Sequence, residues 1–200
     1  MRLPVPQLRS HMPRWAADTE LIVFAGGYGG DSYVRALSVF CAAATSLRHA
    51  SSSSSFGFVF SPHPGYPSSY EEGLFTRWGC LTEGGNLKVV RPKQWGGVTT
   101  AQLVSVAKAS ASMDSTVGAQ SLAIGVPHVY VSDRDDVWTR MGLISNALTP
   151  ESLVGVLNVT FRARGFRAPT DAMARVGVPS NGTAIMEERL RSLLRRDAIP

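Results

Sequence analysis

The sequence predicts an α/β protein: a single Rossmann-like half-domain of three layers, in which helices cover both faces of a mainly parallel sheet of about five strands. Three observations support this fold class. Short apolar runs alternate with segments of helical periodicity, which is the pattern of βαβ units. Some of these runs are apolar at every position, as expected for strands buried on both faces. Turn-forming loops separate the segments, and right-handed crossovers then place the strands side by side.

The length and composition fit one globular domain. The chain has 200 residues, of which 44% are hydrophobic and 18% charged, enough to bury an ordinary core. We expect residues 1–18 to form a flexible lead-in and residues 19–200 to form the Rossmann-like nucleotide-binding domain with C-terminal helices. The net charge of +5 favours phosphate-bearing ligands, nucleic acid or an anionic membrane face, although a basic surface without a special partner explains it equally well.

The cysteines and the N-terminal region indicate a cytoplasmic protein. Cys41 and Cys80 are far apart and form no CxxC motif, so we expect both thiols to be reduced. The first twenty residues contain three prolines and no apolar core of a signal peptide. No run reaches the roughly 18 apolar residues of a membrane span. Peripheral attachment to a membrane through a partner stays open.

The first predicted βαβ unit starts at the apolar run 21–25 (LIVFA), which reads as a buried parallel strand. The glycine-rich loop 26–30 (GGYGG) follows it. Asp31 or Ser32 can then cap a helix over 33–49.

The second unit follows a serine-rich loop and begins with a strand over 56–60 (FGFVF). The turn 61–67 is too rich in proline to be helical. A helix then extends to Trp78 and carries Glu71 and Glu72 in its first turn, where the helix dipole favours acidic side chains. Gly84 and Gly85 break the chain before a third short strand over 87–90.

The second half continues the alternation. Its expected elements are a helix over 101–108, a strand over 109–113, a helix over 117–124 and a strand over 128–132. Pro150 at the first position of a helix over 150–162 is a strong start signal. The last helix, over 183–196, has an apolar stripe at helical spacing.

Three loops with chemically useful residues follow predicted strands, and ligands of open α/β sheets bind at the carboxyl ends of strands. The loop 26–30 does not have the GxGxxG spacing, and no acidic residue follows the second strand, so we disfavour NAD. The backbone of these glycines can still approach a phosphate or sugar closely. Candidate ligand contacts are Gly27, Tyr28, Gly29 and Gly30. A flexible strand-to-helix turn is the alternative.

His63 is the candidate catalytic residue. Pro62 and Pro64 restrict the backbone on either side of it and so fix the direction of the imidazole. Because the pKa of histidine lies near neutrality, His63 can donate a hydrogen bond to a phosphate or protonate a leaving group. Pro64 is expected beside the ligand. A structural role for His63 is the alternative.

The third loop places Asp114, Ser115 and Thr116 at a helix start. Backbone N–H groups without helical partners and two hydroxyls make this position suited to an anion, although Ser and Thr are also ordinary helix caps. Asp114 can bind a ribose hydroxyl, position the turn or cap the helix. No metal is expected, since Asp135 and Asp136 lie in a later turn that reads as solvated.

The His63-Pro64 pair, the Asp114-Ser115-Thr116 turn and the following Gly125-Val126-Pro127 resemble the carboxyl-terminal half of GT-B glycosyltransferases. The resemblance is to the branch with "HP" and "S-S/T" motifs, which includes bacterial sialyl- and polysialyltransferases and capsule and teichoic-acid polymerases. Nucleotide-sugar 2-epimerases share the same half-domain. The resemblance implies that His63, Ser115 and Thr116 hold the phosphate and nucleotide of the donor.

The resemblance covers residues 21–132 and leaves the acceptor-binding half of a GT-B enzyme without a counterpart. It implies a donor-binding domain that transfers a glycosyl group and releases a nucleotide, either with a partner chain or as a truncated form. A complementary acceptor-domain protein or a second copy of this chain would be the partner. The nucleotide sugar is the substrate, and no cofactor is expected. A non-catalytic nucleotide-binding or scaffold protein is the alternative.

A third hypothesis is nucleic-acid binding through a cluster of arginines. Its members are Arg162, Arg164, Arg167 and Arg175. No aromatic platform or known motif accompanies them, so a solvated basic loop is the simpler interpretation and the nucleic-acid signal is weak.

Overall fold

The protein folds around one parallel sheet, as the computed structural model shows. The structure describes residues 16, 19–63, 65, 67–82, 87–90 and 97–162. The sheet has six strands in the order β3-β2-β1-β4-β5-β6, and every pair of neighbours is parallel. The strands are β1 Glu20–Ala25, β2 Phe56–Ser61, β3 Leu87–Val89, β4 Ala109–Ser112, β5 His128–Tyr130 and β6 Ser145–Asn146. The predicted α/β class and parallel sheet are therefore confirmed.

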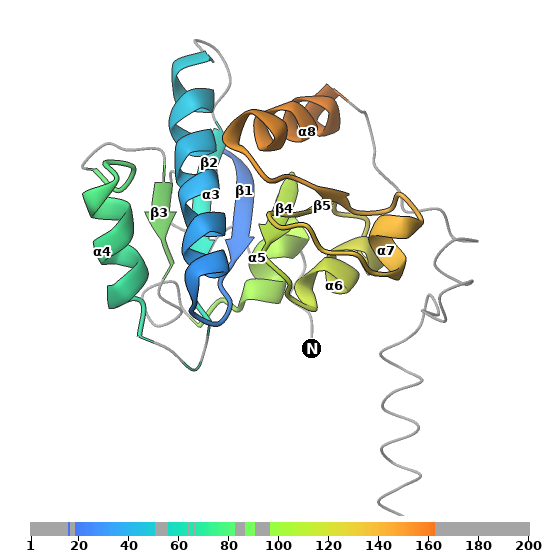
Figure 1. Ribbon diagram of the computed structural model, residues 1–200, viewed down its shortest axis with the longest axis horizontal. Helices are drawn as coiled ribbons and strands as arrows, with labels where there is room; N and C mark the ends of the chain where they lie inside the picture. The colour runs from blue at the N-terminus through green and yellow to red at the C-terminus, as the bar shows by residue number, and fades with distance from the viewer. Residues whose placement is uncertain are drawn as a thin grey trace, which may run out of the picture.

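Helices cover both faces of the sheet and complete the three layers (Figure 1). The helices of the described part are α3 Asp31–Ala50, α4 Ser69–Arg77, α5 Thr100–Val106, α6 Val117–Ala123, α7 Val137–Arg140 and α8 Pro150–Arg162. One apolar core joins α3, α4 and α8 to the near face of the sheet in Figure 1. A second core joins α5 and α6 to the far face.

Alternation along β1 assigns its side chains to the two cores. Ile22 and Phe24 belong to the core under α3, whereas Leu21 and Val23 belong to the core under α5. Side chains of a strand alternate between faces, so a central strand with helices on both sides must be apolar at consecutive positions. This requirement explains why the run LIVFA identifies β1 in the sequence.

The carboxyl ends of three neighbouring strands are in register. Ala25, the last residue of β1, pairs with Ser61 of β2 on one side and with Ser112 of β4 on the other. The loops that follow these strands therefore leave the sheet at one edge, the lower edge in Figure 1.

Two short elements were not predicted. Strand β6 has two residues and α7 has four, and both follow the predicted charged turn at residues 133–136. Such short elements carry too few residues to show a periodicity. Asp136 caps α7 with hydrogen bonds from the backbone amides of Trp138 and Thr139.

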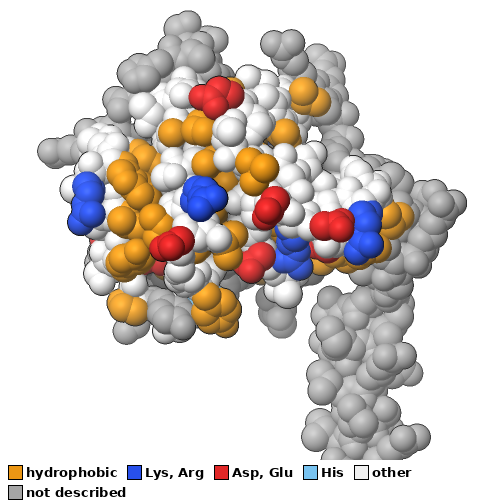
Figure 2. Space-filling model, in the orientation of Figure 1, with side chains coloured by type: hydrophobic (Ala, Val, Ile, Leu, Met, Phe, Trp, Pro, Cys, Tyr) orange, Lys and Arg blue, Asp and Glu red, His pale blue; other side chains and the backbone are white. Residues whose placement is uncertain are grey.

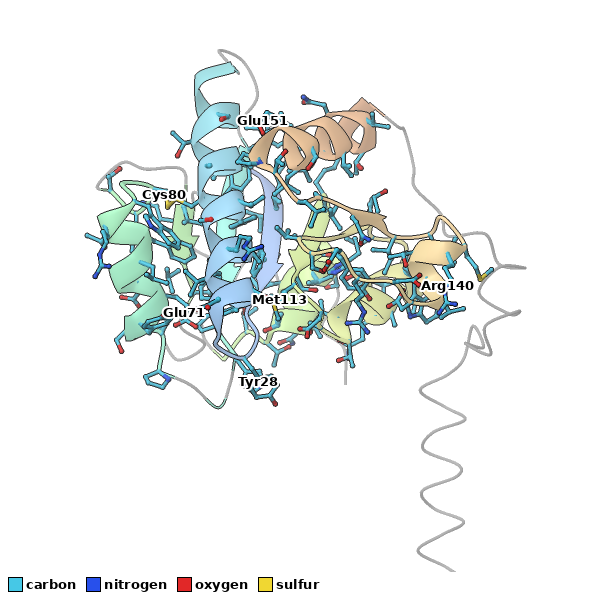
Figure 3. The ribbon with its side chains drawn as sticks, in the orientation of Figure 1. Tyr28, Glu71, Cys80, Met113, Arg140 and Glu151 are labelled. Atoms are coloured by element: carbon cyan, nitrogen blue, oxygen red, sulfur yellow. A yellow bond between two sulfur atoms is a disulfide. The ribbon has the colours of Figure 1, made fainter. Side chains whose placement is uncertain are left out.

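The prediction of two reduced cysteines is wrong for this structure. Cys41 in the middle of α3 and Cys80 just after α4 form a disulfide, with their Cα atoms 5.7 Å apart. The two helices pack on the same face of the sheet, and Figure 3 shows Cys80 between them. Their separation of 39 residues in the sequence hides this proximity.

Some predicted features lie outside the described residues. These are Pro64, the lead-in 1–18 apart from Ala16, the helix over 183–196, and Arg164, Arg167 and Arg175. Within the described part, no helix is long and apolar enough to cross a membrane, and no three His, Cys, Asp or Glu side chains gather into a metal site. Figure 2 shows acidic and basic side chains interspersed over one face of the molecule.

Candidate functional site

The loop after β1 packs directly on the turn after β2. The Gly26 N–H donates to the Ser61 carbonyl over 2.8 Å. A Cβ atom on Gly26 would lie 2.9 Å from the His63 amide nitrogen and 3.0 Å from the Ser61 carbonyl oxygen, too close for any side chain. Glycine at position 26 thus allows the close approach that brings the glycine-rich loop against the His63 turn.

His63 is held by its own turn and by Tyr28. The Gly65 N–H donates to His63 Nδ1 over 3.1 Å, so a neutral imidazole carries its proton on Nε2 and is a donor there. The ring centroids of Tyr28 and His63 are 4.7 Å apart. Tyr28 is 61% exposed, and Figure 3 shows it beyond the carboxyl end of β1, where Met113 also lies. Tyr28 and His63 therefore place two neighbouring rings at this edge of the sheet.

The Asp114 turn approaches the glycine-rich loop from the other side. A Cβ atom on Gly27 would lie 3.9 Å from Asp114 Oδ1. The structure therefore brings Gly27, Tyr28, His63 and Asp114 into one neighbourhood, as the sequence predicts. No atom comes within 4 Å of a Cβ built on Gly29 or Gly30, so these two line open space.

The hydroxyls of Ser115 and Thr116 differ in their hydrogen bonds. The Ser115 hydroxyl accepts the Val117 N–H over 3.2 Å, beside Thr116, the N-cap residue of α6. The Thr116 side chain is exposed and makes no capping hydrogen bond. Because α6 has only seven residues, its dipole alone makes a weak anion site, and the neighbouring loops must supply the rest.

Arg134 is a site residue that the sequence analysis did not identify. Its Nη1 donates to the Asp114 carbonyl, its Nε lies 2.8 Å from Asp136 Oδ2, and its guanidinium stacks over the Tyr130 ring at 4.8 Å. One third of the side chain is exposed (33%), so a positive charge reaches solvent beside the Asp114 turn. A charged loop after β5, the strand next to β4, is the signal that could have shown it.

Asp136 is the anionic partner of Arg134, and its side chain is only 18% exposed. Burial acts to raise the pKa of this carboxyl. Hydrogen bonds from the Thr139 and Trp138 amides and the nearby Arg134 guanidinium outweigh burial and lower the pKa. The expectation of a solvated turn therefore holds for Asp135, whose side chain is 74% exposed, and is wrong for Asp136.

His128 at the start of β5 is a second residue that sequence analysis missed. It is buried behind the Asp114 turn, between β4 and α6, and contacts the hydroxyls of Ser110 and Ser112. Burial, with a smaller contribution from Arg134, lowers the pKa of His128 to about 3. The imidazole is consequently neutral at physiological pH.

This shift predicts a loss of stability in mild acid. The pKa of a histidine in the unfolded chain is about 6.5. Between that pH and the native pKa of about 3, the unfolded state binds the proton and the native state does not. Stability therefore falls as the pH decreases, by up to about 1.4 kcal/mol per pH unit, and this group adds no pH dependence above 6.5. Urea denaturation between pH 7.5 and 4.5 measures the slope.

The control for this experiment is the His128→Phe variant. Both proteins contain the same carboxylates, so the difference between their slopes of stability against pH is the contribution of His128. We expect a smaller slope in the variant below pH 6.5. Equal slopes would show that His128 is not held neutral.

Known proteins resemble this chain in structure and not in sequence. No family model matches it, and no curated protein matches it by sequence. The UDP-GlcNAc 2-epimerase from Neisseria meningitidis bound to UDP-GlcNAc aligns with a TM-score of 0.60 and 12% identity, covering 94% of this chain and 48% of that chain. The Methanocaldococcus jannaschii UDP-GlcNAc 2-epimerase in complex with UDP-GlcNAc and UDP aligns with a TM-score of 0.57 and 12% identity, covering 86% and 46%. CalG4, the calicheamicin glycosyltransferase, aligns with a TM-score of 0.54 and 17% identity, covering 94% and 46%.

These alignments establish the fold. The protein has the fold of a GT-B half-domain. Identities of 12% to 17% carry the likeness no further than the fold. The chain spans less than half the length of these three proteins, with 46% to 48% of each covered.

Proposed function

We propose that this protein binds the nucleotide end of a nucleotide sugar and is the donor-binding domain of a glycosyltransferase. The observation that carries the proposal is the meeting of the loops after β1, β2 and β4 at one edge of the sheet. Parallel α/β sheets bind ligands at this edge. Two proteins of similar fold were solved with UDP-GlcNAc, and a third is a glycosyltransferase, which supports the choice of ligand.

Each loop has a role in this proposal. The diphosphate lies over Gly27, Gly29 and Gly30, where the absence of side chains lets oxygen atoms reach the backbone. His63 donates from Nε2 to the phosphate that leaves with the nucleotide, and stabilises the charge that develops there. Tyr28 flanks the imidazole. We propose Pro64 as a further contact of the ligand.

The turn after β4 binds the other side of the ligand. The hydroxyls of Ser115 and Thr116 donate to phosphate, and Asp114 accepts from a ribose hydroxyl. Arg134 adds positive charge beside them. This assignment requires no metal, and the nucleotide sugar is a substrate, so no cofactor enters the proposal.

Glycosyl transfer needs an acceptor and a base for it, which we assign to a complementary acceptor-domain protein or to a second copy of this chain. The motifs around His63, Ser115 and Thr116 make the "HP" and "S-S/T" branch our proposed relationship. We propose the cytoplasm as the location. The Cys41–Cys80 disulfide is the observation against it, because disulfides are rare in reducing compartments.

Calorimetric titration with UDP, CDP and CMP tests the binding proposal. We expect at least one of them to bind with a dissociation constant below about 1 mM, the weak end of specific binding. His63→Ala and Ser115→Ala should each weaken that binding by about 5- to 50-fold, because each removes a hydrogen bond to a charged ligand.

The matched control is Ser105→Ala. Ser105 lies on α5, which precedes β4, and its hydroxyl donates within the helix to the Gln102 carbonyl. We expect this variant to bind like the wild type. Absence of binding at millimolar concentration of all three nucleotides would contradict the proposal.

A scaffold that retains nucleotide binding without turnover is the second candidate, since neither the described loops nor the alignments identify a base for the acceptor. The two are separated by co-purification followed by an assay of nucleotide release. Release by the complex identifies the enzyme, and binding without release identifies the scaffold.

A further inference from the structure

Four buried side chains behind the Asp114 turn form one hydrogen-bonded chain. His128 Nε2 lies 3.0 Å from Ser112 Oγ, and His128 Nδ1 lies 2.8 Å from Ser110 Oγ. Ser110 Oγ lies 2.8 Å from Ser121 Oγ. All four residues are buried, on β4, β5 and α6.

The two ends of this chain are backbone groups at the start of α6. The Ser115 N–H donates to Ser112 Oγ over 3.2 Å. At the other end, the Ser121 hydroxyl donates to the Val117 carbonyl over 2.7 Å. The chain therefore begins and ends within the three residues 115–117.

Proton counting fixes the direction of every bond. Ser121 gives its only proton to the Val117 carbonyl, so it must accept from Ser110. Ser110 uses its only proton for this bond to Ser121, so at His128 Nδ1, also 2.8 Å away, Ser110 can only accept. The Pro127 carbonyl at 3.3 Å is the more distant acceptor. The proton of His128 is thus on Nδ1, and Nε2 accepts from Ser112.

The opposite tautomer breaks the chain. With the proton on Nε2, Ser112 Oγ would receive both that proton and the Ser115 N–H, and its own proton would have no acceptor in the chain. The Ser110 hydroxyl would then donate to His128 Nδ1, and no proton would be left for the hydrogen bond between Ser110 and Ser121. A doubly protonated ring fails at Ser112 alone, because Ser112 Oγ would again receive two protons and its own proton would have no acceptor in the chain.

The His128 ring also packs against the backbone of α6. A Cβ atom on Gly118 would lie 3.0 Å from His128 Cδ2 and 2.7 Å from Tyr130 Oη, so the helix backbone packs directly against β5. The groups that act electrostatically on His128 are Arg134, which opposes its protonation, and Asp136, which favours it. The Tyr130 ring stands edge-on at 5.2 Å. Gly118 and Ser121 of α6 carry no charge.

We propose that His128 is a positioning residue for the 114–116 turn: its neutral, Nδ1-protonated imidazole relays one directed hydrogen-bond chain that fixes the Ser115 amide and the Val117 carbonyl. The extension of this role to ligand affinity rests on the proposed nucleotide binding. The role of His128 in orienting the turn does not depend on nucleotide binding.

Two variants test the chain, and one neighbour controls for stability. His128→Phe removes the relay and keeps an aromatic ring. Ser112→Ala removes only the acceptor of the Ser115 N–H and is the milder change if the first variant folds poorly. Val129→Ala is the control, because Val129 is buried on the same strand but faces the opposite core. It removes packing without touching the chain.

The first measurement uses the wild-type protein and long-range ¹H–¹⁵N spectra of its imidazoles. We expect His128 to be neutral with the proton on Nδ1 throughout pH 5 to 7.5. An Nε2-protonated ring, or titration near pH 6.5, would overturn the proposal.

The second measurement is hydrogen exchange of the Ser115 amide. We expect exchange about tenfold faster or more in Ser112→Ala and His128→Phe, and unchanged exchange in Val129→Ala. Equal rates in Ser112→Ala and the wild type, or equal acceleration in all three variants, would overturn it.

The third measurement is the affinity for UDP in the same proteins. We expect a loss of about tenfold in the two chain variants and none in Val129→Ala. If the wild type fails to bind UDP, the proposed function fails while the imidazole and amide measurements still decide the positioning role. If the wild type binds and the chain variants bind equally well, the positioning role in ligand binding is wrong.

Discussion

Replacing Phe24 by alanine is expected to lower the free energy of unfolding by about 3 to 5 kcal/mol. Phe24 is fully buried on β1, the strand between β2 and β4 in the sheet. Its ring centroid lies 4.9 Å from that of Phe40 on α3 and 6.0 Å from that of Phe60 on β2. The variant loses the transfer free energy of the ring and leaves a cavity between three elements. Urea denaturation monitored by circular dichroism measures the difference.

Tyr70→Ala is the control for this experiment, because Tyr70 is an exposed aromatic side chain on α4. We expect it to change the free energy of unfolding by less than about 1 kcal/mol. If Phe24→Ala lowers the free energy of unfolding as little as Tyr70→Ala does, the central place of β1 in the core is contradicted.

Removing the disulfide is expected to have an effect of similar size. The Cys41–Cys80 bond closes a loop across 39 residues, and the chain-entropy relation gives about 4 kcal/mol for a loop of this length. The double variant Cys41→Ala with Cys80→Ala should therefore be less stable than the wild type by about this amount. Denaturation with and without dithiothreitol provides the measurement.

Reduction should act on the wild type alone. We expect dithiothreitol to lower the stability of the wild type towards that of the double variant, and to leave the double variant unchanged. A wild type whose stability is the same under both conditions would show that the cysteines are not paired. Thiol alkylation in fresh lysate then shows whether the bond is present in the cell, which bears directly on the proposed cytoplasmic location.

The parallel sheet could be predicted because its central strands are recognisable without tertiary information. Leu21 to Ala25 and Phe56 to Phe60 are apolar because helices cover both sides of them. The start of α8 at Pro150 is a local signal too. In contrast, β6 consists of two exposed residues that belong to the sheet only because β5 lies beside them.

The site could be predicted in part for a related reason. Parallel topology places the loops after β1, β2 and β4 at one edge whatever their sequences, so the neighbourhood of Gly27, His63 and Asp114 follows from the order of the elements. The roles of Arg134 and His128 depend on contacts between β4 and β5 that no local pattern records. His128 in the sequence is one polar residue beside a proline, and its burial becomes visible only when α6 is placed over it.

The central claim is that a nucleotide binds at the carboxyl edge of this sheet. Titration of ¹⁵N-labelled protein with UDP, followed by ¹H–¹⁵N correlation spectra, tests it most directly because it reports the location as well as the binding. We predict saturable shifts concentrated in residues 26–30, 61–65 and 112–118, the three loops that meet beyond β1, β2 and β4. Unchanged spectra at millimolar UDP, or shifts confined to the opposite edge around residues 106–109 and 126–128, would contradict it.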